Sequence, residues 1–244
     1  MYQRKMTVKE EMAINLNNKK IKDLNHNLKL FINEIFSGVN QNEYIRCDIK
    51  NGSKIDLTIH YKNQTRNISL FQDGVCLVYQ NRVKKFVGYL LSIGVSIDSI
   101  LAILTYHYAD GTYDGSGVCN VLGEELSMVY AKEVQKVCDE LKNEAILSKI
   151  IDHILIYEAS GDSVDYFYVG DVRRGIYSSK EHVKKKMLLL EDNYQHKFMR
   201  IGNFNYMPAK RTSYYSEKNE SKKHICTLKL NISKYIKKQG KNPL

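Results

Sequence analysis

The stretch EYIRCDIKNGSKIDLTIHY, residues 43–61, alternates apolar and polar residues on both sides of an Asn-Gly pair. Such alternation is typical of strands with one buried face, and Asn-Gly is typical of a tight turn. A three-residue loop that ends at Gly52 places Cys47 opposite Ile55, so that both apolar sets share one face. A two-residue turn would put them on opposite faces. The sequence therefore predicts a β-hairpin with the three-residue loop.

Further periodic segments surround this hairpin. Strands near Asn67–Phe71 and Val75–Tyr79 are expected to extend it into an antiparallel meander close to the N-terminus. Before it, apolar spacing predicts a helix over Glu10–Phe36 that asparagines interrupt or fray early. After it, residues 82–108 read as two helices joined at Gly94, with Ser96 as a helix N-cap.

The rest of the chain continues this helical block and then mixes strands with helices. The expected elements are one long helix or two over residues 122–154, a strand at 165–171, a helix at Lys180–Leu190, one or two strands at 196–207, and a strand at Thr227–Ile232. Because strands and helices come in blocks and do not alternate, the predicted fold class is α+β.

The composition predicts a globular protein. With 43% hydrophobic residues and no Pro-rich or Ser-rich linker, the chain is expected to form a single compact domain over residues 1–244, with 180–244 as a basic C-terminal subregion. No apolar run approaches the roughly 18 residues that span a bilayer. The charged start MYQRKMTVKEEM lacks the apolar centre of a signal peptide, so no membrane association and a cytoplasmic location are expected.

The cysteines are odd in number and scattered. None forms a C-x-x-C pair, which argues against a disulfide framework and against a structural zinc site. Reduced, mostly buried thiols are expected, and no cofactor is predicted. The cysteines are Cys47, Cys76, Cys119, Cys138 and Cys226.

The positive charge is concentrated at one end of the chain. The formal net charge is +10, yet residues 180–244 hold 16 Lys and Arg against 5 Asp and Glu, and residues 1–179 hold 21 against 22. Such asymmetry favours a polyanionic partner, either nucleic acid, DNA or RNA, or an acidic protein.

Cations alternate with aromatic residues inside this basic region. Cations neutralise phosphates and release counterions, and exposed rings provide stacking surfaces for unpaired bases. The alternative is that the rings face the core along a strand while the lysines solvate its other side. The residues expected to contact nucleic acid are Lys184, Lys185, Lys186, Lys197, Arg200, Phe204, Lys210, Arg211, Tyr214 and Tyr215.

The glycine-rich loop HYADGTYDGSG, residues 107–117, could hold a metal, hold a phosphate or turn the chain. Asp110 and Asp114 match the first and fifth positions of a helix-loop-helix calcium loop, but Val121 stands where that loop needs its bidentate carboxylate. The two aspartates would repel a phosphate. We therefore expect a turn between helices and no metal.

Two shorter patterns have stronger structural explanations than functional ones. LLSIGVSIDSILAIL, residues 90–104, has the outline of a DNA-reading helix-turn-helix, but its exposed face lacks cations, which favours a packed helical hairpin. Asp48-Ile49-Lys50 has the acidic-x-Lys form of some metal-dependent nucleases. In the predicted register, however, Asp48 faces Lys54 and Arg46 faces Asp56, as on a charge-paired sheet surface.

Three hypotheses about function follow. The leading one is an intracellular nucleic-acid-binding protein that uses the basic, aromatic C-terminal surface. The second is a metal-dependent nuclease acting on the same ligand, with Asp48 and Lys50, or Asp110 and Asp114, near the metal. The third is an interaction or inhibitor protein that binds an acidic partner or another protein's nucleic-acid groove.

Overall fold

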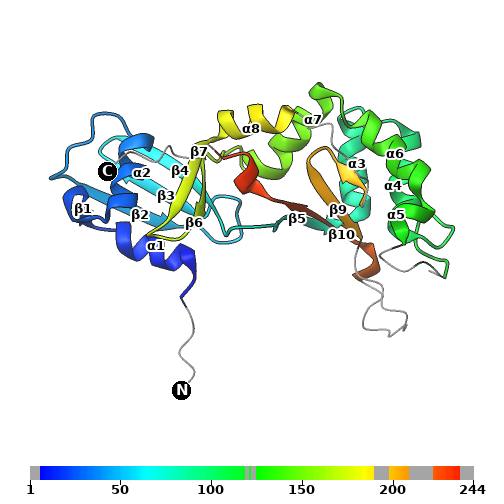
Figure 1. Cartoon of the computed structure of the whole chain (residues 1–244), viewed down its shortest axis with the longest axis horizontal. Coiled ribbons are helices and arrows are strands. Elements are labelled where there is room, and N and C mark those ends of the chain that lie inside the picture. Colours follow the sequence, from blue (N-terminus) through cyan, green and yellow to red (C-terminus); the bar gives the residue numbers. More distant parts are fainter. Residues whose placement is uncertain (1–5, 119–120, 122–124, 190–197, 209–221, 237–244) are drawn as a thin grey trace, which may run out of the picture. The chain divides into compact units, whose positions relative to one another are not determined.

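A computed structural model describes residues 6–118, 121, 125–189, 198–208 and 222–236 of the chain. The expected α+β class is confirmed, with an N-terminal strand meander and helices in the middle (Figure 1). In the part that the structure describes, no helix is long and apolar enough to cross a membrane.

Contacts between residues group the chain into two compact units. Unit 1 comprises Met1–Cys76, Leu155–Lys186 and Asn231–Leu244, and unit 2 comprises Leu77–Ile154 and Met187–Leu230. The basic subregion of residues 180–244 is therefore divided between the two units. The single domain over residues 1–244 stays a prediction.

Unit 1 is built on a six-stranded sheet with the strand order β1-β2-β3-β4-β6-β7. Neighbouring strands are antiparallel except β4 and β6, which are parallel. The strands are β1 (Lys19–Lys20), β2 (Tyr44–Ile49), β3 (Leu57–Tyr61), β4 (Gln64–Phe71), β6 (Tyr166–Gly170) and β7 (Gly175–Ser179). The helices are α1 (Val8–Leu16), α2 (His26–Ile35), most of α8 (Lys180–Leu188), and short 3-10 turns at Ile21–Asp23 and Ile232–Lys234.

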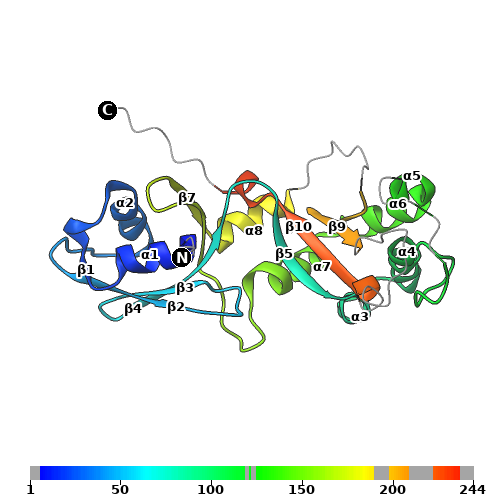
Figure 2. The ribbon, with the colours of Figure 1, turned by 90° about the horizontal axis from the view of Figure 1, so that it is seen from below.

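Helices α1 and α2 cover one face of this sheet (Figure 2). The expected interruption of the N-terminal helix is confirmed, because α1 ends at Leu16 and α2 begins only after its N-cap Asn25. In α2, Phe31 is fully buried and packs edge-on against Tyr168 of β6, with the ring centroids 5.1 Å apart. The unit 1 core thus lies between the two helices and the sheet.

The β2–β3 hairpin forms, but its predicted register is wrong. Cys47 lies opposite Ile59 instead of Ile55, so a longer loop joins the strands. The carboxylate of Glu158 accepts hydrogen bonds from Ser53 Oγ at 2.7 Å and from the backbone N–H of Lys54, and this long-range anchor stabilises the longer loop. The apolar residues still face the core, because a shift of four residues preserves the alternation.

Unit 2 contains a four-stranded sheet with the order β5-β10-β9-β8 and most of the helices. The strands are β5 (Cys76–Arg82), β8 (Arg200–Ile201), β9 (Phe204–Pro208) and β10 (Ile225–Leu230). The helices are α3 (Val83–Ser92), α4 (Ile97–Tyr108), α5 (Leu126–Val129), α6 (Ala131–Glu140), α7 (Glu144–Ile151) and the first three residues of a π-helical turn at Asp152–Ile156.

The predicted fourth strand of the meander exists but belongs to this second sheet. The edge of β4 that it would occupy is taken by β6, and β5 pairs with β10 instead. Gly74, with φ of +94°, turns the chain between β4 and β5. The position of this strand in the meander is therefore corrected.

The central helices follow the sequence closely. Gly94 separates α3 from α4 with φ of +101°, and Ser96 is the N-cap of α4 because its Oγ accepts from Ser99 N at 3.2 Å. The run over residues 122–154 is divided more than expected. Asn143 Oδ1 accepts from Ala145 N at 3.0 Å, which starts α7 as a separate helix after α6.

Candidate nucleic-acid interface

Helix α8 carries the first predicted lysines, and its first residue is fixed to the sheet. The backbone N–H of Lys180 donates to the Asp165 carbonyl at 3.0 Å. Its Nζ donates to Ser163 Oγ at 2.8 Å and lies 3.5 Å from Asp165 Oδ1. Lys180 therefore has a structural role, and its contacts fix the position at which α8 begins.

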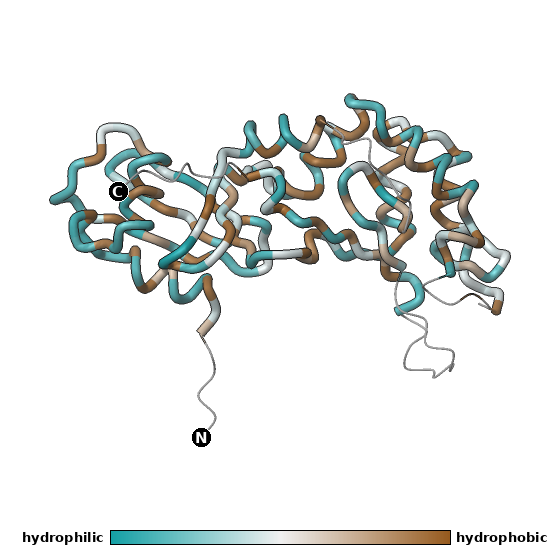
Figure 3. The backbone as a smooth tube through the Cα atoms, viewed as in Figure 1, coloured by the Kyte–Doolittle hydropathy of each residue, from teal (hydrophilic) through white to brown (hydrophobic). Residues whose placement is uncertain are grey.

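The inner face of α8 is apolar, and Lys185 and Lys186 lie on the exposed side of the helix. Val183 is 1% exposed and Met187 is fully buried, one helical turn apart. Lys185 and Lys186 are exposed and Lys184 is half-buried. Neither Lys185 nor Lys186 pairs with a carboxylate among the residues that the structure describes. Figure 3 colours most of α8 as hydrophilic.

Arg200 and Phe204 lie in unit 2, on β8 and β9. Arg200 is half-buried and its Nε donates to Asn205 Oδ1 at 3.3 Å. Phe204 is fully buried, so its predicted role as a stacking surface for bases is wrong. The alternation along β9 explains the error, because Phe204 and Tyr206 both face the core, as the alternative interpretation of the rings expected.

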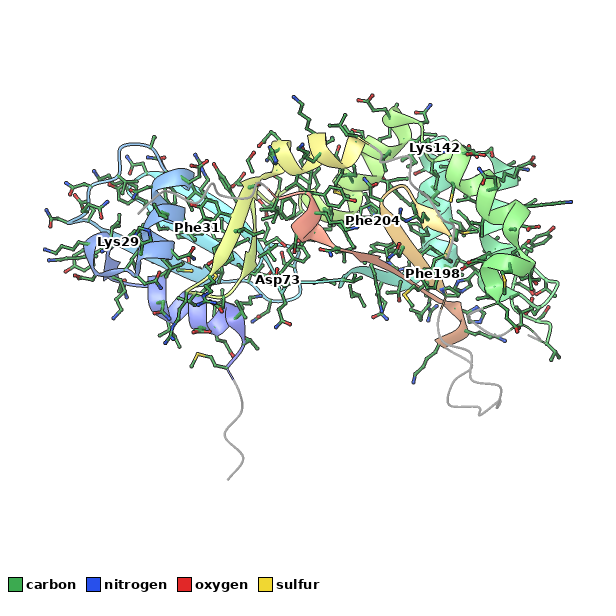
Figure 4. The ribbon with its side chains drawn as sticks, in the orientation of Figure 1. Lys29, Phe31, Asp73, Lys142, Phe198 and Phe204 are labelled. Carbon is green, nitrogen blue, oxygen red and sulfur yellow. The ribbon has the colours of Figure 1, made fainter. Side chains whose placement is uncertain are left out.

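Phe198 belongs to the same alternation of cations and rings but is not among the residues expected to contact nucleic acid. It is 38% exposed and lies just before β8, whereas Phe204 is inside the unit (Figure 4). Strand alternation explains its exposure, since Phe198 and Arg200 share one face while Met199 and Ile201 on the other face are buried. The other predicted contacts fall outside the described residues and stay predictions: Lys197, Lys210, Arg211, Tyr214 and Tyr215.

The glycine loop is a turn, as expected. Asp110 Oδ1 accepts from the backbone N–H of Thr112 at 2.9 Å and from Thr112 Oγ1 at 2.8 Å. Asp114 Oδ1 accepts from Ser116 N at 3.0 Å. The Ser116 hydrogen bonds lower the pKa of Asp114 below its usual range. Each carboxylate thus stabilises its own turn.

His107, at the start of that loop, is part of a buried polar network. Its Nδ1 lies 2.8 Å from the hydroxyl of Tyr206, and its Nε2 lies 2.9 Å from the carbonyl oxygen of Lys223. Burial raises the pKa of Tyr206 well above its ordinary value. This network connects α4 with β9 and with the segment before β10. The role of His107 is therefore structural.

Asp48 has different partners from those predicted. Its Oδ2 lies 2.9 Å from His60 Nε2 on β3 and accepts from Arg46 Nη2 at 3.1 Å. The Arg46 hydrogen bond lowers the pKa of Asp48. The predicted pairs with Lys54 and Asp56 are wrong because the hairpin register differs. The surface is nevertheless charge-paired.

The helix-turn-helix outline is a packed hairpin. On α4, Ile97 is 68% exposed, whereas Ala102 is 6% exposed and lies in the core. Asp98, on the exposed side, forms an ion pair with Lys136 Nζ at 2.8 Å. Among the described residues, no group of three His, Cys, Asp or Glu side chains could hold a metal ion.

The described cysteines are all free thiols. Cys47, Cys138 and Cys226 are buried, and Cys76 is half-buried. Cys119 lies outside the described residues. The expectation of mostly buried thiols is confirmed for these four, and their reduced state stays a prediction.

No family model matches the sequence, and no curated protein matches it. Among solved structures, the chain is similar to the crystal structure of the restriction endonuclease MspI in complex with its cognate DNA. The TM-score is 0.45 and the sequence identity is 12%, over 76% of this chain and 70% of that chain. A likeness of this degree carries no argument about function.

Proposed function

We propose that the protein binds nucleic acid and that Lys184, Lys185 and Lys186 of α8 contact the phosphates. The observation that carries the proposal is the state of Lys185 and Lys186, which are exposed and not neutralised by a described carboxylate. Lys180 fixes the start of their helix through Ser163 and Asp165. The cations are thus presented on a positioned element.

The chemistry of these residues favours backbone contacts over base reading. A lysine ammonium is a strongly hydrated point charge, which suits a phosphate oxygen but lacks the bidentate geometry that reads guanine. Phosphate contacts fix the position of a protein on nucleic acid and carry no sequence information. Binding through α8 is therefore expected to be similar for all sequences.

The test compares two matched double variants by fluorescence anisotropy with a labelled duplex over a series of salt concentrations. Lys185→Gln with Lys186→Gln is expected to weaken binding and to lower the salt slope by about 0.9 for each lost duplex phosphate contact. Lys84→Gln with Lys85→Gln removes the same charge from exposed positions of α3 and is expected to change the slope little. Equal effects of both variants would contradict a defined interface on α8.

The C-terminal residues outside the described part keep their predicted roles. Lys210→Ala with Arg211→Ala is expected to weaken binding to all sequences and to flatten the salt slope. Tyr214→Ala or Tyr215→Ala is expected to cost roughly 1–3 kcal/mol in single-strand binding with little change in slope. Phe204→Ala is instead expected to destabilise the fold by roughly 3–5 kcal/mol, because the ring is buried.

The other two hypotheses are separated by further measurements. Cleavage of DNA or RNA in the presence of Mg²⁺ or Mn²⁺ would support the nuclease. Absence of any binding at about 50 mM salt, where phosphate contacts are strong, would contradict the proposal. Capture of an acidic protein after nuclease digestion would then support the interaction protein.

A further inference from the structure

A second group of exposed cations lies at the tip of the β6–β7 hairpin in unit 1. Residues 171–174 join the two strands, and Arg173 and Arg174 are both exposed. Neither guanidinium has a hydrogen bond or an ion pair within 4.0 Å among the described residues. The pKa of Asp171 is lowered first by hydrogen bonds from the backbone of Arg174 and Arg173 and then by their charges, so this carboxylate acts on both arginines from a distance. This pair lies before the basic subregion, and the charge count therefore gave no indication of it.

The backbone of this tip is fixed by its own side chains. Asp171 Oδ1 accepts from Arg173 N at 2.7 Å and from Arg174 N at 2.8 Å. The Tyr168 hydroxyl donates to the Asp171 carbonyl at 2.6 Å. One carboxylate oxygen of Asp171 is thus engaged by the turn.

Helix α2 holds the tip from a second side. Asn27 Nδ2 donates to the Tyr168 hydroxyl at 2.7 Å, and Asn25 Nδ2 donates to the Val172 carbonyl at 3.1 Å. Val172 itself is 3% exposed and belongs to the unit 1 core. The tip therefore presents two arginine side chains from a backbone whose polar groups are largely satisfied.

We infer that Arg173 and Arg174 form a second phosphate-contacting point for the nucleic acid, and this inference rests on the proposed function. A guanidinium presents a planar fork of donors that matches phosphate oxygens bidentately, and less entropy is lost when the backbone is already fixed. Strand β7 separates the tip from the start of α8 by about 17 Å, at about 3.3 Å per residue, so the two groups of cations are separate contact points.

The separation of the two points distinguishes a nucleic acid, which carries many phosphates, from an isolated small anion. A duplex advances about 3.4 Å per base pair, so the length of β7 alone corresponds to roughly five base pairs. A duplex of about 12 base pairs is long enough to engage both points, whereas inorganic phosphate engages one. Affinity that depends on both points should therefore appear with the duplex and not with inorganic phosphate.

The test measures the salt slope for the full chain and a labelled 12-base-pair duplex. Arg173→Gln with Arg174→Gln is expected to lower the slope by about 0.9 for each lost phosphate contact, in addition to the effect of the α8 variant. Arg173→Lys with Arg174→Lys keeps the charge and is expected to restore most of the slope. Circular dichroism confirms that each variant is folded.

Two outcomes would overturn the inference, and they differ from failure of the proposed function. If the duplex binds with an α8-dependent slope but the Gln variant retains the full slope, the tip makes no phosphate contact. If the Lys variant does not restore the slope, the loss in the Gln variant does not come from charge. If the unaltered chain binds no nucleic acid at about 50 mM salt, the proposed function itself fails.

Discussion

Gly175→Ala is expected to destabilise unit 1 because of a steric conflict inside the hairpin. A Cβ atom at Gly175 would lie 2.0 Å from both Cζ and the hydroxyl oxygen of Tyr168. That ring cannot move away easily, because it is fully buried, packs edge-on against Phe31, and stacks on Tyr177 with the planes 10° apart. The substitution must therefore displace a tightly packed aromatic side chain.

The magnitude follows from two contributions. Overpacking a well-packed core costs about 1–3 kcal/mol. Displacement of Tyr168 also breaks the hydrogen bonds of its hydroxyl with the Asp171 carbonyl and Asn27 Nδ2, each of which contributes about 0.5–1.5 kcal/mol. The free energy of unfolding of unit 1 should thus fall by roughly 2–6 kcal/mol.

The assay is hydrogen exchange on peptides that cover residues 166–179, because it reports on the unit 1 sheet separately from unit 2. Tyr168→Phe alone should cost about 1–3 kcal/mol, since it removes both hydrogen bonds. In the double variant those bonds are already absent, so the two effects should be less than additive by about 1–3 kcal/mol. Additivity within about 0.5 kcal/mol, or a cost of Gly175→Ala below that value, would refute the reasoning.

Three further predictions concern the thiols, the glycine loop and the Glu158 anchor. Burial raises the pKa of Cys47 and of Cys226 to about 12, so alkylation of native protein near pH 8 should leave both unmodified, whereas denatured, unreduced protein should show five free thiols by mass. Calorimetric titration with Ca²⁺ should show no micromolar site, and a tight site lost in Asp110→Ala and Asp114→Ala would contradict the turn. Burial raises the pKa of Glu158, but its hydrogen bonds outweigh this and hold the pKa below 4.5. Its stabilisation is therefore complete above pH 4.5 and lost as the pH falls through the lower folded value. Protection of residues 50–56 from hydrogen exchange should fall in that range, and Glu158→Gln should show the loss at pH 7; unchanged protection would contradict the anchor.

Local sequence patterns predicted the positions of helices and strands better than the pairing of the strands. The helix break at Gly94 and the Ser96 cap depend on neighbouring residues, so they could be inferred from the sequence. The loop between β2 and β3 is bound by Glu158, which lies about a hundred residues away along the chain. The partner of β5 is β10, from the far end of the sequence. Contacts between such distant segments leave no periodic signal.

The residues of the candidate site also fall into those that local patterns predict and those that depend on distant contacts. Lys185 and Lys186 could be predicted because a charge run on an amphipathic helix faces solvent. Phe204 was assigned to the wrong face because the position of β9 relative to the core was unknown at the level of sequence. Arg173 and Arg174 were missed because nothing in a local pattern shows that a turn is fixed by Tyr168. Counting charges identifies basic segments, but it does not show which of them have a backbone that is fixed by hydrogen bonds.

The parallel pairing of β4 with β6 has a consequence for synthesis on the ribosome. Ile68 pairs with Tyr166, so the strand that completes the sheet beside β4 is translated 98 residues later. At about 5–20 residues per second, the growing chain spends roughly 5–20 seconds with that edge of β4 unpaired. An unpaired edge can recruit strands of other chains. Slower translation of residues 72–165 should therefore prolong the exposure of this edge and increase aggregation.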